Sequence, residues 1–316
     1  MRRFRGRAHT GHVTELVTPR EVPLGGLRAM TVRRTLPTRT RSLVGAWCFL
    51  DHYGPDHVAH TGGMEVARHP HTCLATVSWL FTGEIDHLDS GGNSARVRPG
   101  ELNLMSAGRG ITHSEFSTPE TDVLHGVQLW FALPDHARLG DNRFDHYRPE
   151  PVALPDGGEM LVFLGSLLGS TSPVETPTEL IGAEIRMPAG TKLTLPVNPA
   201  HEHALLVDTG LASLDGLDLN RGDLGFVEAG AESLEIVAGD DDLRAVLIGG
   251  EPFGEQIVMW WNFIGRSHDE IVAFREAYQH EITTTDKLGD FGPFPAGTPA
   301  PIPAPPMPNA RLRLRG

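Results

Sequence analysis

The stretch HPHTCLATVSWLF, residues 69–81, sets two histidines two positions apart directly before a long apolar run. A later stretch, HSE, repeats this spacing with His113 and Glu115. Successive side chains of a β-strand point to opposite faces, so residues two positions apart share a face. The pattern therefore predicts that His69 and His71 project together from one strand. It also predicts that the second pair projects from another strand into the same interior.

Short apolar runs separated by turn residues surround these histidines. Between residues 40 and 133 the breaks contain Gly-Pro, Gly-Gly, Ser-Gly-Gly-Asn and Pro-Gly, and no segment repeats at the helical period. This alternation is typical of strands in a β-sandwich or barrel. The expected strands of this half are Leu43–Leu50, Leu74–Phe81, Gly100–Ser106 and Val123–Leu133.

A second β-rich half follows residues 149–158, a segment of Pro, Asp and Gly that we interpret as a linker. A chain of 316 residues is long enough for two domains of about 150 residues, each with its own core. We predict an N-terminal metal-binding domain at residues 1–148, a C-terminal domain at residues 149–290 and a flexible Pro-rich tail at residues 291–316. The expected strands of the second half are Leu161–Leu164, Gly182–Met187, Thr191–Leu195, Ala204–Val207, Leu224–Glu228, Leu234–Val237 and Leu243–Ile248.

One helix is expected near the C-terminus. Ser267 can cap it, and Glu270, three residues later, can reach back in a capping box. Ile271, Phe274 and Tyr278 then fall on one face, and this apolar stripe indicates docking onto a barrel rather than binding of a partner. The expected fold class is all-β, with few short helices and this C-terminal helix.

Charge and composition exclude several classes of function. The formal net charge of −13 repels phosphate backbones, so we expect no direct contact with nucleic acid. Two cysteines, Cys48 and Cys73, are too few for a disulfide framework and fit a reducing compartment. No stretch reaches the roughly 18 apolar residues that span a bilayer, and no apolar signal core follows the basic start. We therefore expect a cytoplasmic protein without membrane contact.

The two histidine-containing motifs together predict a metal site. Three neutral imidazoles and one carboxylate suit one divalent transition metal, with Fe(II) favoured and Mn, Ni, Cu or Zn acceptable. Calcium and magnesium prefer all-oxygen shells, and structural zinc commonly recruits thiolates. The alternative is that these are core or surface histidines that fall at even spacing. Glycines ahead of both motifs, at Gly63, Gly108 and Gly110, favour the metal site, since they provide turns between ligand-bearing strands.

Three segments closely resemble the pirin family. They are HPHTCLATVSWLFTGEIDHLDS (69–90), RPGELNLMSAGRGITHSEF (98–116) and HGVQLWFALP (125–134), and a weaker resemblance covers residues 250–278. The resemblance spans most of the chain apart from both termini. It implies a bicupin, in which two cupin-type β-barrels are stacked and only the N-terminal barrel holds a metal.

The resemblance also assigns residues to the metal. By matching position, it implies that His69, His71, His113 and Glu115 are iron ligands.

The second half contains another H-x-H motif, formed by His201 and His203. The later strand that should supply a closing histidine reads LGFVEAGAESLEIV (224–237) and contains none. We therefore expect the C-terminal domain to lack a complete metal site.

Two functions follow from the resemblance. The first is an iron dioxygenase that opens flavonols such as quercetin, with Glu115 as a ligand and the candidate general base for the 3-hydroxyl. The second is an iron- or redox-sensing regulatory protein that acts through a protein partner. A metal that only holds the strands together, without turnover, is a third interpretation. All three require the same four ligands, so the sequence does not choose between them.

Overall fold

The computed structural model describes residues 14–24, 30–284, 289–293, 295 and 297–316. The basic start of the chain, on which the expectation about a signal segment partly rests, lies outside these residues. Neither helix of the described residues is long and apolar enough to cross a membrane.

The chain forms two compact units that are discontinuous in sequence. Unit 1 comprises the described part of residues 1–21 with Arg33–His52 and Tyr147–Phe253, and unit 2 comprises Tyr53–His146 with the described parts of residues 22–32 and 254–316. The predicted division at residues 148 and 290 stays a prediction, as does the flexibility of the tail.

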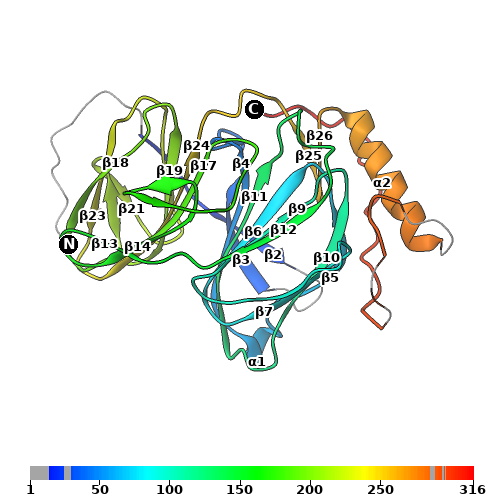
Figure 1. The fold of residues 1–316 in the computed structure, drawn as a ribbon, viewed down its shortest axis with the longest axis horizontal. Coiled ribbons are helices and arrows are strands. Elements are labelled where there is room, and N and C mark those ends of the chain that lie inside the picture. The colour runs from blue at the N-terminus through cyan, green and yellow to red at the C-terminus, as the bar shows by residue number, and fades with distance from the viewer. Residues whose placement is uncertain (1–13, 25–29, 285–288, 294, 296) are drawn as a thin grey trace. The chain divides into compact units, whose positions relative to one another are not determined.

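Unit 1 is built from two antiparallel sheets (Figure 1). The larger sheet begins with the N-terminal strand β1, which pairs with β22. Its order is β1 (Thr14–Val17), β22 (Leu224–Val227), β19 (Glu202–Thr209), β24 (Leu243–Gly250), β17 (Leu180–Met187), β14 (Glu159–Leu164) and β13 (Val152–Ala153). The smaller sheet has the order β18 (Lys192–Pro196), β23 (Ser233–Ala238), β20 (Ala212–Leu214) and β21 (Leu217–Leu219), and β15 (Ser166–Leu167) pairs with β16 (Ser170–Thr171).

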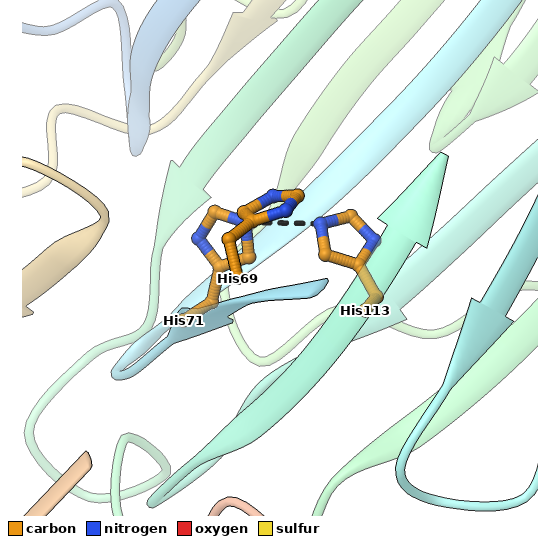
Figure 2. A group of neighbouring side chains, drawn as sticks. All are labelled: His69, His71 and His113. Atoms are coloured by element: carbon orange, nitrogen blue, oxygen red, sulfur yellow. Dashed lines mark hydrogen bonds between the residues drawn. The ribbon is translucent and has the colours of Figure 1, made fainter. Parts of the chain in front are cut away.

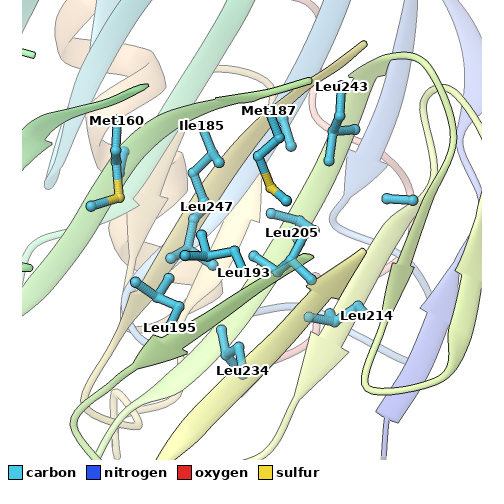
Figure 3. Packing of buried hydrophobic residues seen from close by; sticks show 14 of the residues in the cluster. Met160, Ile185, Met187, Leu193, Leu195, Leu205, Leu214, Leu234, Leu243 and Leu247 are labelled. Atoms are coloured by element: carbon cyan, nitrogen blue, oxygen red, sulfur yellow. The ribbon is translucent and has the colours of Figure 1, made fainter. Parts of the chain in front are cut away.

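The core of unit 1 lies between these sheets. Alternate residues of the larger sheet, such as Ile185, Leu205 and Leu247, meet residues of the smaller sheet, such as Leu195 and Leu234 (Figure 3). All five side chains are buried. Strands with one apolar face can exclude water only by pairing that face with another sheet, so the alternation in sequence becomes a sandwich-like barrel.

Unit 2 also contains antiparallel sheets, and the histidine motifs lie on its strands β5 and β10, which are labelled in Figure 1. One sheet has the order β5 (Glu65–His71), β10 (Ile111–Ser117), β7 (Ile85–Asp89) and β8 (Ser94–Val97). A second sheet has the order β12 (Arg143–Tyr147), β9 (Leu102–Ser106), β6 (Leu74–Thr82), β11 (Val123–Ala132), β4 (Trp47–His57), β3 (Met30–Leu36) and β2 (Arg20–Leu24). Its strands β9, β6 and β11 lie wholly in unit 2, whereas β12, β4, β3 and β2 each have residues in both units. The remaining elements are α1 (Val58–Thr61), the hairpin of β25 (Val258–Trp260) and β26 (Phe263–Gly265), and α2 (His268–Thr283).

The predicted C-terminal helix is confirmed as α2. Ser267 is its N-cap and accepts a hydrogen bond from the backbone N–H of Glu270 at 3.1 Å. The Glu270 carboxylate accepts from the N–H of Arg266, one residue before the cap, at 2.7 Å. Ile271 and Tyr278 are buried in a cluster with Val258 of β25, Phe263 of β26 and residues of the C-terminal segment. The stripe is therefore a docking surface within the chain, as predicted, but it packs against this hairpin and not directly on a barrel sheet.

Each predicted strand overlaps an observed strand, but five predicted bounds extend beyond it. Four of them, at Gly100, Leu133, Thr191 and Glu228, are off by one or two residues, and the fifth differs more. The expected strand at Leu43–Leu50 is β4, which begins at Trp47 and continues through Gly54 to His57. A Cβ atom at Gly54 would lie 2.1 Å from the carbonyl oxygen of Leu124 on β11. This glycine therefore permits a close approach of two strands instead of ending one.

Candidate metal centre

The two predicted ligand pairs lie on adjacent antiparallel strands. β5 carries His69 and His71, β10 carries His113, and the register sets His113 opposite His69. Figure 2 shows the three imidazole rings turned toward one another, with His71 Nε2 and His113 Nε2 3.1 Å apart. One nitrogen of each ring lies within 4.8 Å of the others. The fold thus brings together three of the four predicted ligands.

Backbone carbonyls fix the orientation of two of these rings. His69 Nδ1 lies 2.9 Å from the carbonyl oxygen of Ala67, and His71 Nδ1 lies 3.2 Å from that of Asn262. A carbonyl oxygen only accepts, so in the neutral rings both Nδ1 atoms carry the proton. The Nε2 lone pairs of both rings can consequently bind a metal. The carbonyl contact of Asn262 also connects the C-terminal segment of the chain to the site.

Burial keeps the three rings neutral. His69 is 6% exposed, and His71 and His113 are each 1% exposed. Removal from water lowers the pKa of His69 to about 4 and the pKa values of His71 and His113 well below their usual range. Neighbouring imidazoles lower these pKa values further. Neutral imidazole is the form that binds metals, so the cluster is ready to bind one at pH 7.

The spacing of the nitrogen atoms also fits a transition metal. Two imidazole nitrogens about 2.1 Å from one ion, and at right angles around it, lie roughly 3 Å apart. The separation between His71 Nε2 and His113 Nε2 is 3.1 Å. Imidazole is a ligand of Zn, Cu, Fe and Ni, whereas calcium and magnesium take oxygen. The residues present therefore fit a divalent transition metal.

Glu115 lies at one side of this cluster, where the pairing of β5 and β10 is irregular. His113 is opposite His69 but Glu115 is opposite Val66, so β5 holds one extra residue between the two pairs. A bulge of this kind redirects side chains. Glu115 forms a close group with His113 and His87, and not with the whole histidine triad. The four predicted ligands are therefore not one cluster in this geometry.

The environment of Glu115 strengthens its hold on a proton. Its side chain is buried, and Ser78 Oγ donates a hydrogen bond to Glu115 Oε1 at 3.1 Å. Burial raises the pKa of Glu115 above its usual value, although His87 and the Ser78 hydroxyl act in the opposite direction. A buried carboxylate of this kind can serve as a ligand or as a base.

His87 is not among the ligands predicted from the sequence. It lies on β7, is 4% exposed and contacts the ring of His113. The signal was present in the sequence, since His87 and Asp89 have the same two-residue spacing as the predicted ligand pairs. A carboxylate two positions after a histidine on a strand shares its face, as the structure shows here.

The second H-x-H motif has no comparable surroundings. His203 lies in β19 of unit 1 and His201 lies directly before this strand, with their ring centroids 6.1 Å apart. Among the described residues, no group of three metal-ligating side chains includes either of them. His201 Nε2 instead lies 3.0 Å from a carboxylate oxygen of Glu179.

Comparison with known proteins places the chain in a family. The family model described as pirin matches residues 29–131, and the model described as the pirin C-terminal cupin domain matches residues 182–283. The chain belongs to the pirin family. The all-β fold with two cupin-type domains, expected from the resemblance, is thereby confirmed.

Individual pirin relatives cover most of the chain. A protein of Pseudomonas aeruginosa named "Putative quercetin 2,3-dioxygenase PA1205" is 38% identical over 268 residues, which are 85% of this chain and 84% of that protein. A pirin-like protein of Caulobacter vibrioides is 34% identical over 76% of this chain and 85% of its own. The crystal structure of a quercetin 2,3-dioxygenase from Acinetobacter baumannii matches with a TM-score of 0.87 and 35% identity, over 95% of this chain and 97% of that one.

Proposed function

We propose that the chain is a metal-dependent dioxygenase with quercetin 2,3-dioxygenase-type activity on flavonols. The observation that carries this proposal is the buried, neutral triad of His69, His71 and His113, whose nitrogens converge within 4.8 Å. Pirin relatives named for this activity support the choice of substrate class. In this proposal Glu115 completes the ligand set, and Fe(II) is the resident ion, with Mn, Ni, Cu and Zn as the alternatives.

Bound at the triad, such an ion supplies a Lewis acid that favours the deprotonated form of a chelating hydroxyl. The protein contributes the base. Glu115 takes the proton of the flavonol 3-hydroxyl on Oε2, since Oε1 accepts from Ser78. Burial raises the pKa of Glu115, which makes the carboxylate a stronger proton acceptor than an exposed glutamate. The same burial excludes water from the reacting groups.

Oxygen consumption with carbon monoxide release, measured on anaerobically iron-loaded protein given quercetin, tests the activity. We expect turnover by the natural sequence and a loss of about 10²–10⁴-fold for Glu115→Gln if the carboxylate acts as the base. Glu115→Ala removes both the base and the ligand, so it should also weaken iron binding. No turnover at full iron occupancy would overturn the dioxygenase proposal.

The ligand assignment has its own test, which does not depend on the substrate. His113→Ala should lose stoichiometric iron, because only two of the three converging imidazole nitrogens remain in this variant. Iron content measured after desalting gives the answer. Unchanged iron in this variant would overturn the assignment of His113.

A second candidate is an iron- or redox-sensing regulator that acts on a protein partner. The observation that favours it is the burial of all four candidate ligands, which are 1–6% exposed. In such a protein the change between Fe(II) and Fe(III) would be transmitted by a shift in the surrounding loops. Hydrogen exchange that differs between the two iron states, in a protein without turnover, would support this candidate.

A further inference from the structure

His113 differs from the other two histidines of the triad in the hydrogen-bond partner of its Nδ1 atom. The Nδ1 atoms of His69 and His71 face backbone carbonyls, but His113 Nδ1 lies 3.4 Å from His87 Nδ1. His87 Nε2 in turn lies 3.2 Å from Asp89 Oδ2. A continuous chain of side chains therefore runs from a buried carboxylate through one imidazole to another.

Strand pairing creates this chain. β7 lies beside β10, and the register sets Asp89 opposite His113 and His87 opposite Glu115. His87 and Asp89 are 4% and 1% exposed. His87 and His113 are therefore diagonal neighbours on the two strands, and the Cβ atoms of such pairs lie about 7–8 Å apart, which is still within reach of two imidazole rings. The contact is therefore set by regular strand geometry and does not depend on a loop.

The proton positions follow from the partners. An ionised carboxylate only accepts, so Asp89 requires the proton of His87 on Nε2. The neutral His87 ring then has a bare Nδ1, which accepts from His113 Nδ1–H. His113 is left with a bare Nε2, and this is the atom that faces His71 in the triad. One carboxylate thus selects the tautomer of both rings.

Asp89 is itself held in place. Its Oδ1 accepts hydrogen bonds from the backbone N–H and the side-chain amide of Asn93, both at 3.0 Å. The ring of Phe144 packs against the imidazole of His87, with the two ring centroids 4.9 Å apart. The carboxylate and the imidazole therefore have little freedom to turn away from His113.

We propose that His87 and Asp89 are positioning residues that hold His113 in the Nδ1–H tautomer and aim its Nε2 at the metal. The inference rests on the proposed metal site and goes beyond the four predicted ligands. A hydrogen-bonded acceptor behind a ligating imidazole orients the ring and raises its basicity, and losing it typically weakens metal binding by about 10–100-fold. Only His113 has a side-chain acceptor, so it is the ligand whose support a substitution can remove.

The test uses the full chain, stripped of metal and reloaded with Co(II), in three variants. His87→Phe keeps an aromatic ring against Phe144 but removes the acceptor. His87→Gln restores an acceptor through its amide oxygen, and Asp89→Asn keeps the shape while removing the charge. A matched control is His201→Phe, which removes a buried histidine paired with a carboxylate in unit 1.

Co(II) affinity is measured by competition with a chelator, and the coordination of the ion by its visible absorption and X-ray absorption spectra. We expect His87→Phe to bind about 10–100-fold more weakly, His87→Gln to recover most of that loss, and the control to match the natural sequence. The Co(II) affinity of Asp89→Asn should fall between that of His87→Phe and that of the natural sequence. The number of imidazoles bound to cobalt should be the same in all of these proteins.

Three results would overturn the inference. Equal affinity and spectra for His87→Phe and the natural sequence would show that the acceptor has no role. One imidazole fewer around cobalt in His87→Phe would make His87 a ligand instead of a positioning residue. A weakening that His87→Gln does not recover would indicate packing alone. Failure of the natural sequence to bind Co(II) would instead overturn the proposed function itself.

Discussion

His203 gives a sharp test of how burial controls the stability of the second barrel. Its side chain is 1% exposed, and both ring nitrogens lack a hydrogen-bond partner among the described residues. Burial, followed by the nearby ring of His201, lowers the pKa of His203 from 6.5 to about 4. Replacing it by leucine removes the titrating ring and keeps an apolar side chain of similar size at the same place.

The expected magnitude follows from the difference in proton binding between the folded and unfolded states. Between about pH 4 and pH 6.5 the unfolded chain binds this proton and the folded chain does not, so the free energy of unfolding falls as the pH falls. The difference between a pKa of 6.5 in the unfolded chain and about 4 in the folded chain corresponds to about 3 kcal/mol lost between pH 7 and pH 4. Below about pH 4 both states hold the proton, and the contribution stays constant.

Urea unfolding at several values of pH between 7 and 4 provides the assay. We expect His203→Leu to lose about 3 kcal/mol less than the natural sequence over this range. At pH 7 it should be as stable or more stable, because a buried polar group without a partner costs about 1–3 kcal/mol. His136→Leu, at an exposed position, controls for the general effect of removing an imidazole. Parallel pH profiles for His203→Leu and the natural sequence would refute the argument.

Three further predictions concern packing. Tyr278→Phe removes the hydrogen bond from the Tyr278 hydroxyl to the carbonyl oxygen of Ile302 at 2.7 Å, so we expect a loss of about 1–2 kcal/mol and faster proteolysis of the C-terminal tail; an unchanged rate would show that this bond does not hold the tail. Gly54→Ala forces a Cβ atom to within 2.1 Å of the Leu124 carbonyl oxygen and should lower the yield of folded protein, which the natural yield at 37 °C would contradict. Leu195→Ala empties part of the core of unit 1 and should cost about 2–5 kcal/mol in urea unfolding, whereas a cost below 1 kcal/mol would indicate that the core collapses around the gap.

The sequence predicted the local features of the site. The two-residue spacing of His69 and His71 determines that they share a face of their strand, since this follows from strand geometry alone. The N-cap at Ser267 was also predictable from nearby residues, because its hydrogen-bond partner is the N–H of a residue three positions away. The resemblance to pirins, carried by three continuous segments, added the expected fold and ligands, and the family matches confirm the fold.

What the sequence alone could not show depends on register between distant strands. Glu115 groups with His113 and His87 and not with the whole triad, next to a shift in the register of β5 and β10, and no local pattern reveals which residue it will face. The partnership of His87 with His113 likewise arises only when β7 lies beside β10. Spacing along one strand fixes which side chains share a face. Pairing between strands, which depends on the packing of the whole barrel, decides which faces meet and therefore which atoms can share a metal or a proton.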